Sequence, residues 1–190
     1  MATPGFIIYL PDYEDSLNWA SQSLTSGTLH NWNLQLYPGV NGHKETLSDY
    51  NIKIFQGSKK CVKYMSRPGT QGCFLSHWKL WNKAKELNTT ISIIEHDIIF
   101  TGANLKNEFC DIIKFEGFKK AKPIPPGNWW EGARAYSITP IGADKILSWI
   151  DKNGAMPADW MLCDGIVDIV FDNNNTVEVN QHNFSFTRDL

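Results

Sequence analysis

The sequence predicts an α/β protein, because short β-branched segments alternate with segments of helical periodicity. Gly5 to Leu10 is an apolar run that ends at Pro11, and the apolar spacing from Asp15 to Leu24 favours a helix. A second apolar run, Ile91 to Ile94, follows a segment from Cys73 to Leu87 whose aromatic residues recur at helical spacing. This alternation predicts a mixed, mostly parallel sheet flanked by helices.

Further elements complete this pattern along the chain. Strands are expected at Trp32 to Tyr37, Ile52 to Phe55, Arg134 to Ile138 and Thr176 to Val179. Helices are expected at Ile141 to Ile150 and around Ala158 to Val167. Thr139 and Pro140 are a good N-cap and first helical residue. Glycine-containing pairs, Ser26-Gly27 and Asn153-Gly154, are expected to end the first and the later helix.

Length and composition predict one globular domain over residues 1–190. Hydrophobic residues make up 42% and charged residues 20% of the chain, and the net charge of -2 disfavours nucleic acid as a partner. The four cysteines show no CxxC spacing, so free thiols are expected. No segment resembles a signal peptide or is apolar enough to span a bilayer. We therefore expect a cytoplasmic protein without stable membrane insertion.

An acidic pair follows the buried strand Ile91 to Ile94. Glu95 and Asp97 flank His96, and ligands of open parallel sheets bind outside the carboxyl ends of the strands. Residues i and i+2 of an extended segment point the same way, so both carboxylates can converge on Mg²⁺ or Mn²⁺, while His96 faces elsewhere. The alternative is that the pair only makes a strand end soluble.

A family resemblance rests on two motifs. The segment Gly69 to His77, which contains Gly72-Cys73-Phe74-Leu75-Ser76-His77, and the later Glu95-His96-Asp97 resemble motifs of glycosyltransferase family 25. Ala135 to Gly142 and Pro157 to Asp159 follow in the family's order. The resemblance covers nearly the whole chain.

This resemblance implies a single GT-A-like, Rossmann-related domain. It further implies an inverting transferase that uses Mn²⁺ or Mg²⁺ and a UDP-sugar, with galactose or glucose as the transferred hexose. The family includes lipooligosaccharide (lipopolysaccharide biosynthesis) and collagen galactosyltransferases. The expected acceptor is a saccharide or another hydroxylated molecule.

The resemblance also suggests roles for individual residues. Asp159 is the candidate base or acceptor-positioning carboxylate, and it otherwise offsets a helix dipole. His77 and Ser76 are candidates for orienting the diphosphate or the acidic triplet, although His77 also fits a buried core histidine. Asp97, Glu95 and His182 are the expected metal ligands.

Three more side chains are candidates for contacts with the substrates. Arg67, like Glu95 and Ser76, is expected to bind the nucleotide sugar, in its case by neutralising phosphate. Trp129 and Trp130 could stack on a sugar, and core packing is their other interpretation. The ordinary alternatives for Arg67 and His182 are a loop arginine and an exposed histidine.

Two positions depart from the family pattern. Thr70 stands where the family usually has glutamate, and His96 replaces the middle acid of the triplet. These departures suggest an alternative function, a non-catalytic carbohydrate-binding protein on a degenerate transferase scaffold. A metal-dependent phosphoesterase would need more acidic and histidine ligands than the sequence supplies.

Overall fold

The fold is built on a six-stranded mixed sheet with the strand order β2-β1-β3-β8-β5-β9. The computed structural model describes residues 3–103, 110–117, 120–174 and 176–180. The strands of this sheet are β1 (Pro4–Tyr9), β2 (Asn33–Pro38), β3 (Ile91–Glu95), β5 (Ile112–Lys114), β8 (Ala135–Ile138) and β9 (Ile169–Phe171). Neighbours pair in parallel except at β8, which is antiparallel to both β3 and β5. The predicted α/β class with a mixed, mostly parallel sheet is confirmed.

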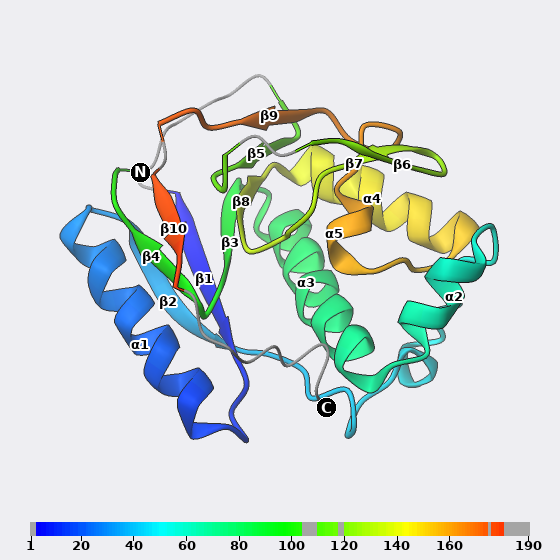
Figure 1. Ribbon diagram of the computed structural model, residues 1–190, viewed down its shortest axis with the longest axis horizontal. Coiled ribbons are helices and arrows are strands. Elements are labelled where there is room, and N and C mark those ends of the chain that lie inside the picture. Colours follow the sequence, from blue (N-terminus) through cyan, green and yellow to red (C-terminus); the bar gives the residue numbers. More distant parts are fainter. Residues whose placement is uncertain (1–2, 104–109, 118–119, 175, 181–190) are drawn as a thin grey trace.

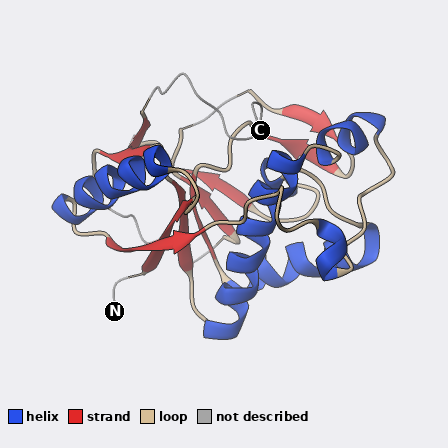
Figure 2. Ribbon diagram, turned by 90° about the horizontal axis from the view of Figure 1, so that it is seen from below, coloured by secondary structure: helices blue, strands red, loops and turns tan. Residues whose placement is uncertain are grey.

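Helices cover both faces of this sheet (Figures 1 and 2). The helices are α1 (Glu14–Leu29), α2 (Lys59–Met65), α3 (Pro68–Leu87), α4 (Pro140–Asn153) and α5 (Ala158–Met161), with a 3-10 turn η1 (Leu47–Tyr50). Two small antiparallel ribbons accompany them. One pairs β4 (Ile98–Phe100) with β10 (Val177–Val179), and the other pairs β6 (Lys122–Ile124) with β7 (Gly127–Trp129).

The strands supply two cores because successive side chains point to opposite faces. Ile91 and Ile93 of β3 join the larger core under α3, α4 and α5, whereas Ile94 joins the smaller core under α1. β3 is therefore buried on both faces, as its unbroken apolar run predicts. Phe74 and Trp81 of α3 are fully buried in the larger core, which fixes this helix beside the end of β3.

Several predicted boundaries differ from the structure. Ser26-Gly27 does not end α1, which continues to Leu29. Gly27 lies inside the last turn of the helix, where its lack of a side chain lets Leu34 and Phe100 pack closely. Ile52 to Phe55 forms only an isolated bridge, from Ile54 to Ala155. The helix expected around Ala158 to Val167 ends at Met161.

The early end of α5 has a local cause. The chain turns back toward β7 after Met161, where Cys163 forms a bridge with Trp129 and the Asp164 N–H donates to the Asn128 carbonyl. In α4, by contrast, the Thr139 hydroxyl accepts from the Gly142 N–H, and the helix ends at Asn153 before Gly154 as predicted.

The four cysteines are free, also as predicted. No described helix combines the length and apolarity needed to cross a membrane.

Candidate active site

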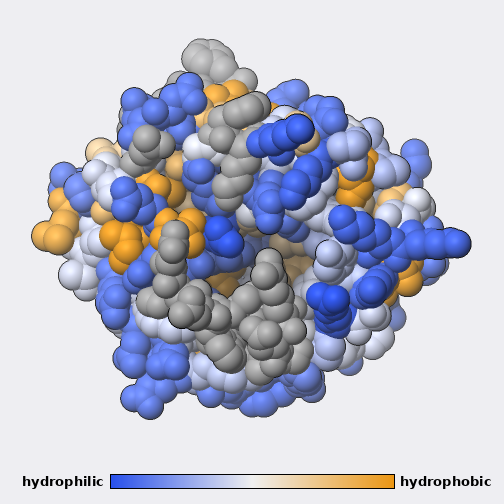
Figure 3. Space-filling model, viewed as in Figure 1, coloured by the Kyte–Doolittle hydropathy of each residue, from blue (hydrophilic) through white to orange (hydrophobic). Residues whose placement is uncertain are grey.

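A pocket of about 320 Å³ lies where the end of β3 meets α2, the start of α3, the β6–β7 ribbon and α5. Its charged lining residues are Lys60, Arg67, Lys122 and Arg134 on the cationic side and Glu95, Glu131 and Asp159 on the acidic side. Figure 3 shows a hollow near the centre of one face of the molecule, with many hydrophilic residues around it. The pocket therefore offers charges of both signs at a carboxyl end of the sheet, where ligands of α/β proteins bind.

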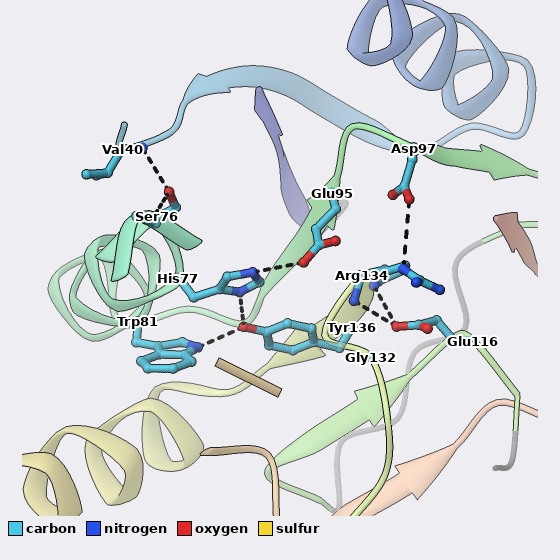
Figure 4. Close-up of polar contacts among 12 residues, drawn as sticks. Val40, Ser76, His77, Trp81, Glu95, Asp97, Glu116, Gly132, Arg134 and Tyr136 are labelled. Atoms are coloured by element: carbon cyan, nitrogen blue, oxygen red, sulfur yellow. Dashed lines mark hydrogen bonds and ion pairs between the residues drawn. The ribbon is translucent and has the colours of Figure 1, made fainter. Parts of the chain in front are cut away.

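Glu95, the last residue of β3, lies at the end of a buried polar chain (Figure 4). Its Oε1 is 3.5 Å from His77 Nε2, and His77 Nδ1 is 2.9 Å from the Tyr136 hydroxyl oxygen. Trp81 Nε1 donates to the same hydroxyl over 2.8 Å. The His77 and Tyr136 rings are stacked with an angle of 11° between their planes. His77 is thus placed by the core, with one ring nitrogen turned toward Glu95.

The hydrogen bonds from Trp81 through Tyr136 to His77 also select the tautomer of a neutral His77 ring. Because Trp81 Nε1 only donates, the Tyr136 oxygen accepts there and still has its own hydrogen to give. Donation of that hydrogen to His77 Nδ1 leaves the ring proton on Nε2, facing the Glu95 carboxylate. Burial opposes ionisation of Glu95, but His77, Arg134 and His96 outweigh it, so the pKa of Glu95 lies below its usual value.

Asp97 takes a different partner from Glu95. Its Oδ2 lies 3.8 Å from Arg134 Nε, toward which the carboxylate points in Figure 4. Its Oδ1 is buried and has no hydrogen-bond partner among the described residues. Burial, and then the charge of Glu95, raise the pKa of Asp97 to about 7. His96 stacks on Trp19 of α1. His96 and Asp97 lie in the turn between β3 and β4, so the extended segment expected over residues 95–97 ends at Glu95.

Asp159 enters the same pocket from the first turn of α5. Burial raises its pKa to about 6, although nearby Lys114 and a hydrogen bond from the backbone of Gly132 favour the charged form. The Lys114 side chain is buried and donates to the carbonyls of Trp130 and Gly132. Lys114, at the end of β5, thus holds the 130–132 loop close to Asp159.

Gly132 is needed where this loop turns. Its φ is +93°, and an added Cβ would collide with the Glu116 carboxylate, whose Oε1 accepts from the Arg134 N–H over 2.7 Å. We expect Gly132→Ala to cost about 1–3 kcal/mol of unfolding free energy because both strain and the collision must be relieved. Urea unfolding would measure this cost. Gly102→Ala is the matched control, since Gly102 lacks a positive φ and its added Cβ would meet only Thr176, so equal losses in both variants would contradict the prediction.

The raised pKa of Asp159 predicts a stability cost at neutral pH. The folded chain binds this proton more tightly than the unfolded chain, so the contribution of Asp159 to stability falls as pH rises from about 4 to about 6. A shift of roughly 2 units corresponds to at most about 3 kcal/mol. Asp159→Asn should therefore unfold at higher urea than the native chain at pH 8, and the difference should shrink at pH 4. A variant that is less stable at pH 8 would contradict this prediction.

Of the other predicted site residues, Arg67 lines the pocket and Ser76 does not. Arg67 lines the pocket beside Thr70, and its guanidinium lies 5.1 Å from the Tyr64 ring centroid. Ser76 is buried, and its hydroxyl accepts from the Val40 N–H and donates to the Gly72 carbonyl, which ties the loop after β2 to α3. Its hydrogen bonds therefore give Ser76 a structural position. His182 lies outside the described residues.

Trp129, Trp130 and Asp164 also differ in position. Trp129 lines the pocket and packs against Trp160 of α5 with ring centroids 5.5 Å apart, while Trp130 packs against Phe171. Asp164 is outside the pocket lining and accepts from the Asn128 backbone N–H and side chain. Its role is to close the turn after α5.

Sequence reasoning missed three charged residues that shape the site. Arg134 lines the pocket and pairs with Asp97, Glu116 fixes the backbone before β8, and Lys114 supports the loop beside Asp159. Lys114 carried a signal, because a lysine inside the run Ile112-Ile113-Lys114-Phe115 interrupts an otherwise apolar strand. Arg134 and Glu116 carried none, since both precede or follow strands where charges are ordinary.

The fold and the pocket define an α/β protein whose ligand site lies at the end of a central strand. The chain belongs to glycosyltransferase family 25: the family model described as "Glycosyltransferase family 25 (LPS biosynthesis protein)" matches residues 3–122. No curated protein matches the sequence.

Two solved structures of the glycosyltransferase GlyE from Streptococcus pneumoniae TIGR4 resemble the chain. The apo form is 12% identical with a TM-score of 0.46 over 90% of this chain, and the second structure is 11% identical with the same TM-score over 91%. The chain spans 45% of the length of each.

Proposed function

We propose that this chain transfers a hexose, galactose or glucose, from a UDP-sugar to a hydroxyl group of a glycan or another acceptor, with inversion at the anomeric carbon. The observation that carries the proposal is that Asp159, a carboxyl group whose pKa is raised to about 6, shares one pocket with Glu95 and with several cationic side chains. Family membership supplies the reaction class. The free thiols agree with a reducing compartment, so we place the reaction in the cytoplasm.

The donor diphosphate fits the cationic side of the pocket. Arg67 at the start of α3 and Lys60 of α2 line it. Neither side chain forms an ion pair with another described residue. A guanidinium presents two parallel N–H donors to phosphate oxygens, which makes Arg67 the stronger candidate. Arg134 is partly engaged by Asp97 and would add positive charge nearby.

The acidic pair at the end of β3 fits a hard divalent cation such as Mn²⁺ or Mg²⁺. Buried Asp97 Oδ1 has no partner among the described residues, so one carboxylate oxygen has lone pairs to give. Glu95 is held ionised beside it, as its lowered pKa indicates. These two residues would hold the cation, which when bound neutralises charge on the departing diphosphate. His182 stays a candidate third ligand.

Asp159 is the group that would accept the proton of the acceptor hydroxyl. Its pKa near 6 leaves it mostly ionised at neutral pH yet more basic than an ordinary aspartate. His77 is buried beneath the pocket and is not one of its lining residues, but its Nε2 lies 3.5 Å from Glu95, which does line it. We therefore assign His77 the orientation of Glu95 rather than a proton transfer. Trp129, Trp160 and Tyr64 line the same pocket and offer ring surface to a sugar.

Aromatic pocket walls would also suit a carbohydrate-binding protein without catalysis, and turnover separates the two functions. We would measure UDP release without acceptor from UDP-galactose, UDP-glucose and UDP-N-acetylglucosamine, each with Mn²⁺ and with a chelator. Slow release from one hexose donor that requires the metal is the expected result. Saccharide binding without release from any donor would favour the non-catalytic function instead.

A further inference from the structure

Three potential metal ligands of different chemistry meet at the inner wall of the pocket. Cys73 and His77 lie four residues apart on one face of α3, and Glu95 ends β3 opposite them. One ligand atom of each, the cysteine sulfur, a histidine nitrogen and a carboxylate oxygen, lies within 4.8 Å of the other two. Cys73 and Glu95 both line the pocket, so the cluster can be reached from it.

His77 provides an independent sign that this cluster can bind a ligand. The side chain is 1% exposed, and its Nε2 has no hydrogen-bond partner among the described residues. The Glu95 oxygen lies 3.5 Å away, which is beyond a normal N–H···O hydrogen bond. A buried ring nitrogen that makes only this long contact lacks a full hydrogen bond, which costs free energy, and a ligand between it and the carboxylate would remove that cost.

We propose that Cys73 Sγ, His77 Nε2 and a carboxylate oxygen of Glu95 form a binding site for a thiophilic divalent cation of the Zn²⁺ class, whose fourth ligand comes from the pocket. Sulfur, imidazole nitrogen and carboxylate oxygen are the ligands that zinc takes, and three protein ligands leave an open position. From bond lengths of about 2.0–2.3 Å, ligand atoms around tetrahedral zinc are roughly 3.3–3.6 Å apart. The His77–Glu95 separation of 3.5 Å already meets this value.

The protons balance within the chain and solvent. Binding releases the Cys73 thiol proton to water, and the His77 ring proton moves from Nε2 to Nδ1. The Tyr136 oxygen, which already accepts from Trp81, has a second lone pair with which it accepts from Nδ1. A metal-bound histidine is usually oriented by such a bond through its other nitrogen.

The cation that this site prefers differs from the one proposed for the donor. Mn²⁺ and Mg²⁺ favour oxygen ligands, whereas thiolate selects zinc. Both sites need Glu95, so zinc and the donor-bound metal exclude each other. Inhibition of transfer by zinc is therefore the expected consequence, and it rests on the proposed function, whereas zinc binding itself does not.

Cobalt(II) tests the binding without any assay of transfer. The full chain, freed of metal with a chelator, is titrated with Co²⁺, and the expected result is a near-ultraviolet sulfur-to-cobalt charge-transfer band that saturates at about one equivalent and is abolished by Zn²⁺. Cys73→Ser should lose the band and Cys110→Ser should keep it, since Cys110 is outside the pocket lining. The absence of a band in the native chain, or an unchanged band in Cys73→Ser, would overturn the proposal.

A second measurement needs no variant. The native chain is treated with N-ethylmaleimide with and without Zn²⁺, and the modification of each cysteine is followed by mass spectrometry. Zinc should slow modification of Cys73 at least tenfold and leave Cys110 unchanged. Equal rates at Cys73 with and without zinc would also overturn the proposal.

Discussion

Asp159→Asn is expected to lower kcat/KM for hexose transfer by about 10²–10⁴-fold, the usual contribution of a general base. The asparagine keeps the size of the side chain and an oxygen that can accept from the Gly132 backbone, but it cannot take a proton. Affinity for the UDP-sugar should change by no more than about threefold, because Arg67 and Lys60, the side chains proposed to bind its diphosphate, are unchanged in this variant. Steady-state kinetics and calorimetric donor titration measure the two effects separately.

A control variant and a pH profile test this prediction further. Asp164→Asn changes an aspartate that closes the turn after α5 outside the pocket lining, so it should retain transfer. For the native chain, kcat/KM should fall about tenfold per pH unit below pH 6, since protonation removes the base. Transfer by Asp159→Asn within tenfold of the native rate would exclude Asp159 as the base.

Asp97→Asn should weaken the metal-dependent part of donor binding and turnover by at least about 10²-fold. The change removes one negative charge and one strong oxygen ligand from the acidic pair, while the remaining amide oxygen is a poorer ligand for a hard cation. Metal-independent binding of the nucleotide should persist, because Arg67 and Lys60 are unchanged. Donor titrations with and without Mn²⁺ separate these contributions.

Asp144→Asn is the matched control for Asp97→Asn. Asp144 is an exposed residue of α4 that pairs with Lys85, and exposed pairs contribute little to stability. This variant should bind the donor like the native chain. If Asp97→Asn does so too, the acidic pair at the end of β3 does not hold the metal.

The central strands could be predicted from the sequence because each carries its own signal. β1 and β3 are short, apolar runs bounded by turn residues, and α4 begins with Thr139 and Pro140 at the expected positions. Three-residue strands such as β5 and β9 could not be predicted, since their pairing depends on partners far along the chain rather than on their own pattern.

The site was predictable in part. Glu95 and Asp159, both singled out from the sequence, line one pocket. The turn at His96 and Asp97, which ends the extended segment at Glu95, was not predicted. The separate partners of Glu95 and Asp97 could not be foreseen, because His77 and Arg134 reach them from α3 and from the start of β8. Such contacts are set by the tertiary fold.

The linkage between Mn²⁺ and UDP binding is the most direct test of whether the pocket holds a metal and a nucleotide together. Free Mn²⁺ is followed by electron paramagnetic resonance during titration of the native chain, with and without UDP, and UDP binding is followed by calorimetry with and without Mn²⁺. If one pocket holds both, UDP must raise the affinity for Mn²⁺ by the same factor by which Mn²⁺ raises the affinity for UDP, at least about fivefold. No UDP binding, or binding of the two ligands without mutual effect, would contradict a metal-dependent nucleotide-sugar site at Glu95 and Asp97.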